Sequence, residues 1–158
     1  MVQRASAIEI GPMDMDGGVA DARTLFKEYA SSLGHEFSLQ DFARELAELP
    51  GAYAPPDGAL LLARWDGRLA GCVALRPLGG GVCQMRRLFV RHQFRGKGLG
   101  KRLALAVIEA ARGAGHTVMR LEVSPWMVEA IAMYRAMGFQ PIAPAAAGSG
   151  VAMELPLA

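Results

Sequence analysis

Glycines and cations alternate in residues 93–102, which read Gln-Phe-Arg-Gly-Lys-Gly-Leu-Gly-Lys-Arg. The apolar run at 88–90 predicts the end of a β-strand before this stretch. Leu99, Leu103 and Val107 recur at helical spacing after it. Glycine lets the main chain approach a ligand closely, and the first N–H groups of a helix have no partner within it. The stretch therefore predicts an anion-binding loop, most naturally one for phosphate.

Two common glycine motifs for nucleotides do not fit this stretch. A Walker A loop needs Gly-x-x-x-x-Gly-Lys followed by Ser or Thr. Here Arg91 and Arg95 stand where its first glycine belongs, and Gly98 and Arg102 stand where its hydroxyl residue belongs. The dinucleotide pattern Gly-x-Gly-x-x-Gly is also broken. What remains is Arg95-x-x-Gly98-x-Gly100, between a strand and a helix.

Charge is distributed unevenly along the chain, although the formal net charge is only +2. Residues 1–58 contain ten acidic and four basic residues, whereas residues 67–108 contain nine Arg or Lys and no acid. A field of one sign around the glycine-rich stretch favours capture of a polyanionic small molecule. A nucleic acid is the alternative ligand, but no aromatic side chains alternate with these cations as a base-stacking surface requires.

The length of 158 residues suits one domain, residues 1–158, with a sizeable core. The N-terminus shows no apolar signal segment, and no apolar run is long enough to span a membrane. Cys72 and Cys83 have neither metal nor redox spacing, so we expect buried, reduced thiols on neighbouring strands. These features predict a cytoplasmic protein without a membrane association.

The apolar patterns predict a mixed α/β sheet of about seven strands flanked by four helices. Strands are expected near 7–10, 59–65, 69–75, 82–90, 117–123, 139–143 and 151–155. Helices are expected from Asp14 or Asp16 to Gly34, from Ser38 to Pro50, over 99–113, and from Ser124 to Gly138. Asp66-Gly67 predicts a hairpin turn. The helix between the fourth and fifth strands predicts that these two run parallel. Composition predicts a mobile loop over 144–150.

A second motif follows at 130–139, which reads Ala-Ile-Ala-Met-Tyr-Arg-Ala-Met-Gly-Phe. Together with Arg95-x-x-Gly98-x-Gly100, in this order and separation, it resembles the GCN5-related N-acetyltransferase (GNAT) family over about 83–142. The resemblance implies the GNAT, or acyl-CoA N-acyltransferase, fold. It also implies transfer of an acetyl group from acetyl-CoA to a primary amine of an unidentified acceptor, by direct attack in a ternary complex.

The resemblance assigns acetyl-CoA to the loop and to the strand before it. Backbone N–H groups of the loop would bind the pyrophosphate, and Arg95 would add a side-chain contact. The loop residues are Gly96, Lys97, Gly98, Leu99, Gly100 and Lys101. Leu88, Phe89 and Val90 would hold the pantetheine arm by strand-like pairing, and a backbone N–H there could stabilise the oxyanion. A buried strand is the simpler interpretation of these three, and it is compatible with main-chain contacts.

Tyr134 is the candidate general acid, because the CoA thiolate that leaves has a reference pKa near 8.5 and tyrosine one near 10. A core tyrosine on an amphipathic helix is the alternative. The family often has a glutamate base on the strand before the loop, where this chain has Gln84. Glu122 is the nearest acidic substitute, unless it pairs with Arg120 or a neighbour at the surface. A water chain or an acceptor that arrives neutral would need no side-chain base.

Met127 departs from the family, which often has an asparagine at this position in contact with the cofactor. This departure, together with Gln84, keeps open a second class of function, a non-catalytic acyl-CoA-binding sensor or regulatory module. The acceptor, a small-molecule or peptide amine, is not specified by the sequence, and neither is the length of the acyl group. Formation of a homodimer is also left open by the resemblance.

Overall fold

The structure is a computed structural model that describes residues 7–14, 17–33, 39–143 and 150–157. Its described part contains one seven-stranded sheet in the order β1-β2-β3-β4-β5-β7-β6, with four α-helices. The strands are β1 Ile8–Pro12, β2 Ala59–Trp65, β3 Arg68–Gly79, β4 Val82–Val90, β5 Val118–Val123, β6 Gln140–Ile142 and β7 Val151–Pro156. The helices are α1 Gly18–Leu33, α2 Leu39–Glu48, α3 Leu99–Gly113 and α4 Val128–Ala136, with short 3₁₀ helices η2 Gly51–Tyr53 and η3 His92–Phe94. The predicted mixed sheet is confirmed.

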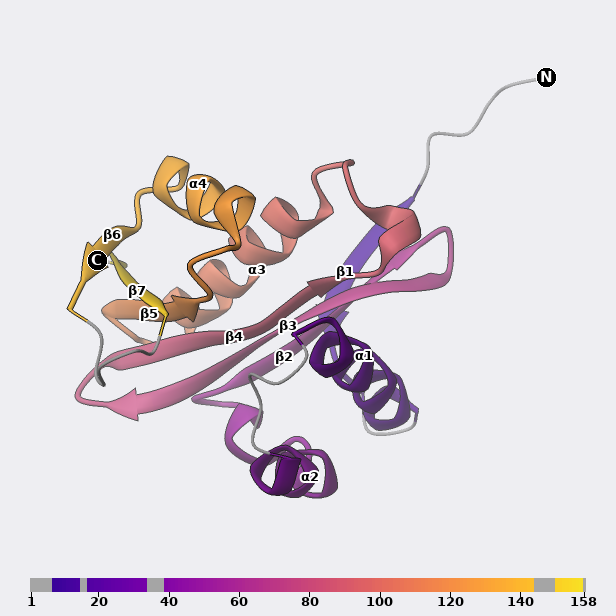
Figure 1. Ribbon diagram of the computed structural model, residues 1–158. Coiled ribbons are helices and arrows are strands. Elements are labelled where there is room, and N and C mark those ends of the chain that lie inside the picture. Colours follow the sequence, from indigo (N-terminus) through magenta and orange to yellow (C-terminus); the bar gives the residue numbers. More distant parts are fainter. Residues whose placement is uncertain (1–6, 15–16, 34–38, 144–149, 158) are drawn as a thin grey trace.

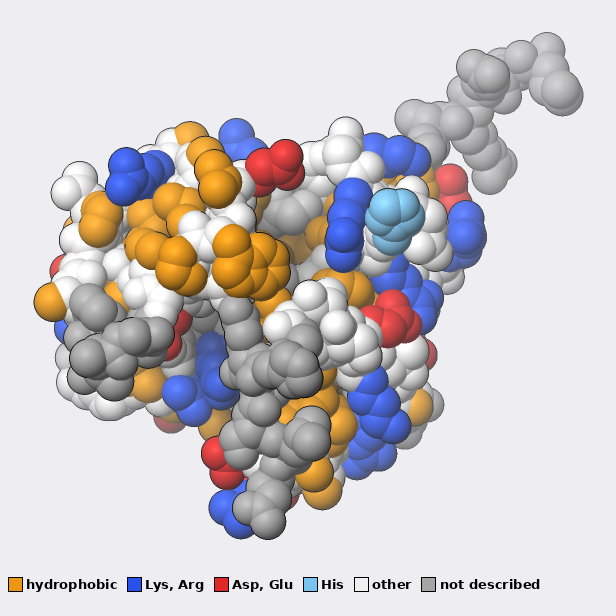
Figure 2. Space-filling view, viewed as in Figure 1, with side chains coloured by type: hydrophobic (Ala, Val, Ile, Leu, Met, Phe, Trp, Pro, Cys, Tyr) orange, Lys and Arg blue, Asp and Glu red, His pale blue; other side chains and the backbone are white. Residues whose placement is uncertain are grey.

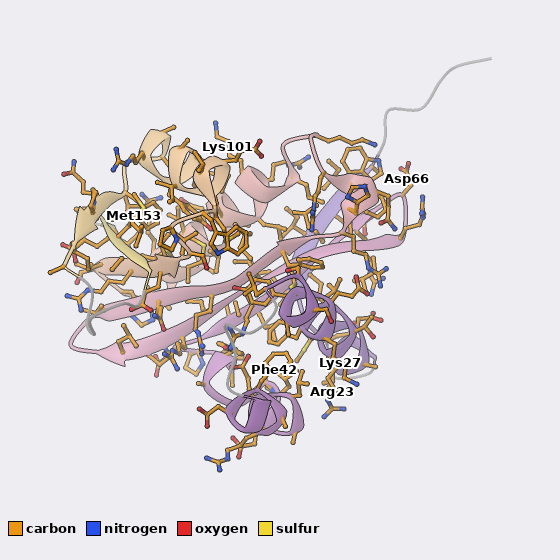
Figure 3. All side chains as sticks on the ribbon, viewed as in Figure 1. Arg23, Lys27, Phe42, Asp66, Lys101 and Met153 are labelled. Carbon is orange, nitrogen blue, oxygen red and sulfur yellow. The ribbon has the colours of Figure 1, made fainter. Side chains whose placement is uncertain are left out.

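The helices cover the sheet on both faces (Figure 1), with α1 and α2 on one side and α3 and α4 on the other. Each side has its own apolar core, because both faces of the central strands are buried. Figure 3 shows Phe42 on the α1–α2 side and Met153 on the α3–α4 side. Among the described strands, only β4 and β5 pair in parallel, as the intervening α3 predicts, and the other neighbours are antiparallel.

Element boundaries differ from the sequence prediction at several ends, and three of these differences have a clear physical reason. β1 continues through Pro12 because it is an edge strand, where proline need not donate to a second neighbour. β3 extends to Gly79 because it keeps its pairing with β4 beyond the end of β2. The helix expected from Ser124 begins instead at Val128, because the chain first forms a turn in which Met127 N–H donates to Ser124 O at 3.0 Å.

Other local predictions are confirmed within the described part of the chain. Asp14 caps α1 by accepting a hydrogen bond from Gly18 N–H at 3.2 Å. Asp66-Gly67 forms the β2–β3 hairpin turn. Asp16, Gly34, Ser38 and residues 144–149 of the expected mobile loop lie outside the described residues.

A β-bulge at Arg87 interrupts β4 and was not predicted. Val73 of β3 faces two residues of β4, Arg87 and Leu88, instead of one. Arg87 has a φ of +61°, a left-handed conformation that is uncommon for a residue with a side chain. The Cys72 thiol donates a hydrogen bond to the Arg87 carbonyl oxygen at 3.3 Å, in the buried interior.

The bulge changes which side chains face which side of the sheet. Before it, Met85 packs in the core beneath α3. Arg86 and Arg87 then both face α1 and α2, where a regular strand would have placed them on opposite faces. After the bulge, Leu88 packs on the α3 side and Phe89 in the core beneath α1. Two adjacent arginines are therefore directed to the same face.

Candidate active site

A cleft opens where β4 and β5 separate. The two strands pair only over 82–84 and 118–120, so their later residues have no ladder partner on the side where the strands diverge. The cleft there has a volume of about 950 Å³ and is lined by α1, α2 and η2 on one side, by β3 and β4, and by β5 and α4 on the other. The strands before and after the glycine-rich loop therefore splay apart at this edge of their pairing.

The glycine-rich loop joins β4 to α3 and offers an open backbone. Gly96 and Gly98 have φ values of +75° and +80°, and a Cβ at either would meet no heavy atom within 4 Å. Gly98 is the N-cap of α3 and makes no side-chain cap. The first N–H of the helix to reach a helical carbonyl belongs to Arg102, which donates to Gly98 O at 3.2 Å. The preceding N–H groups are thus available to an anion.

Cations surround this loop, and two of them rest against aromatic rings. Arg95 donates from Nε to Val90 O at 2.8 Å and lies over the ring of Phe89, while Lys97 lies 5.0 Å from the Trp65 ring centroid. Lys101 is exposed on the first turn of α3. The loop is therefore positively charged at its surface as well as rich in free amides.

The three residues assigned to the pantetheine arm end β4, directly before the loop. Leu88 and Val90 are partly buried against the α3 side, and Phe89 is buried on the other side, where its ring meets Tyr29 edge to face. The interpretation as a buried strand is confirmed, since these side chains belong to the core. The main chain ends where β4 has separated from β5, and its pairing with the pantetheine arm stays a prediction.

Tyr134 is held by the way α4 ends. Gly138, with a φ of +105°, donates to Arg135 O at 3.0 Å, and Phe139 donates to Tyr134 O at 3.0 Å. This pair of bonds is a Schellman motif, which is typically completed by an apolar contact between the residues at its ends. The Tyr134 and Phe139 rings form that contact, with centroids 5.6 Å apart. The Gly-Phe of the motif therefore fixes the ring of Tyr134.

Tyr134 lines the cleft although its side chain is only 6% exposed. Among the described residues its hydroxyl has no hydrogen-bond partner, so the hydroxyl can reach a ligand. Burial raises the pKa of Tyr134 well above the ordinary tyrosine value, with a smaller contribution from Tyr29. The phenol therefore stays protonated at neutral pH.

Glu122 of β5 also lines the cleft, on the same side as α4, and its side chain is exposed. It does not pair with Arg120, which instead contacts Glu154 of β7 at 3.3 Å. Gln84 accepts a hydrogen bond from Arg76 Nε at 2.8 Å. Met127 lies at the start of α4, also in the lining.

An ion-pair cluster on the α2 side of the cleft was missed by the sequence analysis. Arg87, 7% exposed, donates from Nε and Nη2 to the two carboxylate oxygens of Glu45 at 2.8 and 2.7 Å. Burial alone would raise the pKa of Glu45, but the hydrogen bond and charge of Arg87 outweigh it and lower that pKa. The sequence offered one sign of the bulge that creates this cluster. Met85 and Leu88 pack on the same side of the sheet although they are three positions apart, whereas a regular strand repeats every two residues.

Tyr53, which the loop after α2 carries, joins this cluster. Its hydroxyl accepts a hydrogen bond from Arg86 Nη1 at 3.2 Å, and its ring packs edge to face on Phe26. Burial raises the pKa of the Tyr53 hydroxyl, against the lowering effect of Arg86. Tyr53 is therefore both a core residue and part of the cleft lining.

Cys72 and Cys83 are buried and free, on the neighbouring strands β3 and β4, as the sequence analysis expected. Burial raises the pKa of both thiols, that of Cys83 to about 11, so neither is a thiolate at neutral pH. We find no helix in the described chain long and apolar enough to cross a membrane.

Comparison with known proteins places this geometry in a family. The model of the acetyltransferase (GNAT) family matches residues 22–139. An uncharacterised N-acetyltransferase of Schizosaccharomyces pombe is 36% identical, with 88% of this chain and 83% of that protein covered. A GNAT-family acetyltransferase from Staphylococcus aureus has a TM-score of 0.79 at 18% identity, covering 96% and 100% of the two chains. The PaiA N-acetyltransferase of Thermoplasma acidophilum, solved with coenzyme A, has a TM-score of 0.73 at 19% identity, covering 95% and 99%. The chain belongs to the GNAT family of acetyltransferases.

Proposed function

We propose that this protein transfers an acetyl group from acetyl-CoA to a primary amine within a ternary complex. The observation that carries the proposal is the cleft between the separating ends of β4 and β5, which Leu88 and Tyr134 line, together with the glycine-rich loop that follows the same strand β4. We further propose that residues 1–158 act as a single N-acetyltransferase domain. Family membership supports the activity, and the complex of the PaiA relative with coenzyme A supports the donor.

The loop is proposed to bind the pyrophosphate of the donor through the amides of residues 96–101, with Arg95 and the two lysines adding charge. Charge-assisted hydrogen bonds from several amides are roughly twice as strong as neutral ones. The main chain of 88–90 is proposed to pair with the amide-containing arm of the donor, which would place the thioester in the split between β4 and β5.

Tyr134 is proposed to stabilise the departing sulfur. The neutral amine attacks the thioester carbonyl carbon and gives a tetrahedral intermediate, whose nitrogen loses a proton to water. Its collapse breaks the carbon–sulfur bond with both electrons going to sulfur, and the thiolate is then protonated from solvent. Because the pKa of Tyr134 is raised, full proton transfer to a thiolate of pKa about 8.5 is uphill. We therefore propose that the phenol donates a hydrogen bond to the sulfur as charge develops there, rather than surrendering its proton.

Glu122 is proposed as the base that removes a proton from the acceptor ammonium before attack. Its carboxylate lies in the cleft wall, and among the described residues it has no ion-pair partner. Glu45 is a poor base because Arg87 holds its pKa low. A bound water that relays the proton is the alternative, which a Glu122→Gln variant distinguishes by its pH–rate profile.

The test has two readouts. Calorimetry with coenzyme A should show binding, and thioester consumption with a panel of amines should exceed the hydrolysis background. Binding without consumption for any amine would favour the non-catalytic sensor instead. Absence of any heat with coenzyme A would contradict both functions. Salt-sensitive binding to DNA or RNA that coenzyme A does not displace would support the nucleic-acid alternative.

A small-molecule or peptide amine as acceptor follows from the family. A cytoplasmic location remains a prediction that the two buried, reduced cysteines support. Formation of a homodimer remains open, and sedimentation at micromolar concentration would decide it.

A further inference from the structure

Two arginines lie side by side at the base of the cleft, on its acceptor side. Arg76 of β3 stands opposite Gln84 of β4, and Arg86 is two positions further along β4 on the same face. Such diagonal neighbours have Cβ atoms about 7–8 Å apart, within reach of long side chains on one ligand. Both arginines line the cleft and are partly buried. Figure 2 shows Lys or Arg side chains, in blue, within the hollow of this face.

Arg76 has no acidic partner in the described structure. Its Nε donates to the neutral amide oxygen of Gln84 at 2.8 Å, and no described carboxylate lies within 4.0 Å of its guanidinium. Burial and the nearby charge of Arg86 lower the pKa of Arg76. Its positive charge is therefore held beside a like charge and without an ion pair of its own, although the charge of Glu45 opposes part of this effect.

The Glu45 carboxylate contacts both of the other arginines on this side of the cleft, Arg86 and Arg87. Glu45 gives both oxygens to Arg87, and its Oε1 lies 3.5 Å from Arg86 Nη1. Three arginines thus face one acid at the base of the cleft. Asp41, Arg44 and Glu48 of α2 contribute exposed charges of both signs further out, at the rim.

The opposite wall has the reverse charge. Glu122 of β5 faces the cleft and has no ion-pair partner among the described residues. An acceptor that is positive at one end and negative at the other would match both walls. A polycationic acceptor matches less well, because Arg87 already occupies both oxygens of Glu45.

We propose that the acceptor is a primary amine that also carries a carboxylate, which Arg76 and Arg86 bind. The proposal rests on the acetyl transfer proposed above and narrows its acceptor. Arginine forks bind a carboxylate through paired, charge-assisted hydrogen bonds, and these also fix the orientation of the ligand. With the carboxylate on this wall, the amine end is left to face Glu122 and the split between the strands.

The experiment measures kcat/KM for matched acceptor pairs. The panel contains the α-amino acids and β-alanine, each beside its carboxamide, with O-phosphoethanolamine and spermidine as differently charged amines. We expect at least one acid to be acetylated at least tenfold more efficiently than its own amide. Arg76→Met should remove that preference by raising the KM for the acid tenfold or more, while the KM for acetyl-CoA stays within twofold.

Two variants provide controls. Arg120→Met removes an arginine from the next strand, where it pairs with Glu154 and does not line the cleft, and should keep the preference. Arg76→Lys keeps the positive charge but loses the paired donors of the guanidinium, and should retain part of the preference for the acid. If circular dichroism shows that Arg76→Met is unfolded, the preference for the acid over its amide is measured on Arg86→Met and Arg76→Lys instead.

Equal turnover of acid and amide would overturn the proposal, and so would greater turnover of spermidine or O-phosphoethanolamine than of every acid. An Arg76→Met variant that slows acid and amide equally would also overturn it, as would a panel in which no carboxylate-bearing amine exceeds background. If coenzyme A binds, and thioester is consumed with an amine that has no carboxylate, only the proposal of a carboxylate-bearing acceptor fails. No thioester consumption with any amine would mean that the proposed acetyl transfer fails as well.

Discussion

The glycine-rich loop and the arginine-bearing wall of the cleft are built in different ways. At the loop of residues 95–100, the groups that face solvent are main-chain amides and exposed cations, held by glycines with left-handed φ values. At the wall formed by α2, β3 and β4, the groups are side chains that pair with one another, such as Arg87 with Glu45. A site built from the main chain depends little on its side chains, whereas a site built from side chains depends on each of them.

This difference suggests how the protein divides its work. The donor is the same molecule in every turnover and can be held by a fixed backbone. The acceptor is what distinguishes one family member from another, and variable side chains are suited to distinguishing it. Changes at the loop should therefore affect coenzyme A binding, and changes at the wall should affect stability and acceptor choice.

The largest effect is expected from Arg87→Met. The change leaves the Glu45 carboxylate in a largely buried position without its bidentate partner, and breaking a buried pair on one side typically costs about 3–5 kcal/mol. Urea unfolding followed by circular dichroism should show that loss in the free energy of unfolding. The double variant Arg87→Met with Glu45→Met should recover part of it, since no lone charge remains. A loss under about 1 kcal/mol in the single variant would mean that the pair is effectively solvated.

Tyr134→Phe should lower kcat about a hundredfold, because one preorganised donor to developing charge contributes roughly that much. The KM for acetyl-CoA and the melting temperature should hardly change, since the ring and its contact with Phe139 remain. Steady-state kinetics with any accepted amine measures this. A loss of less than about twofold, in a folded variant, would remove Tyr134 from the chemistry.

Gly98→Ala and Gly100→Ala form a matched pair that tests whether the loop acts through its backbone. Gly98 has a φ of +80°, which costs a residue with a Cβ about 1–2 kcal/mol, so we expect coenzyme A to bind about tenfold more weakly. Gly100 lies within α3, where a Cβ would meet only Val90 at 3.9 Å. Alanine there should stabilise the fold by about 0.5–1 kcal/mol and leave binding within threefold. Titration calorimetry and thermal unfolding measure both, and equal weakening would contradict the backbone explanation.

The same difference explains what the sequence could predict. The strand, loop and helix around Gly98 and the end of α4 at Gly138 depend on local conformation, so glycine spacing and apolar patterns were enough to predict these elements and the helix that carries Tyr134. The Glu45–Arg87 pair joins residues 42 positions apart. Its geometry depends on a bulge, and the only sign of that bulge in the sequence is that the core residues Met85 and Leu88 are three positions apart instead of two. Side-chain pairs of this kind depend on tertiary packing, which a short sequence motif does not reveal.

The smallest effect is the contribution of Glu45 to the pH dependence of stability. Arg87 lowers the pKa of Glu45 in the folded protein below its ordinary value of 4.5. A lowered carboxyl pKa gives stability that is fully present above the unfolded pKa and is lost as the pH falls through the folded pKa. Between about pH 5 and pH 3, wild type should therefore lose stability more steeply than Glu45→Gln, by at most about 1.4 kcal/mol per pH unit for one proton.

Glu154→Gln provides the control for this titration. It also removes a carboxylate that faces an arginine, but both side chains of that pair are substantially exposed. Solvent screens such a pair, so its removal should change the free energy of unfolding by less than about 1 kcal/mol. Urea midpoints measured at half-unit steps of pH would separate the two variants. If Glu45→Gln kept the acid slope of the wild type, the Glu45 carboxylate would not be held by Arg87 in solution, and the side chains of the wall would not be fixed by this ion pair.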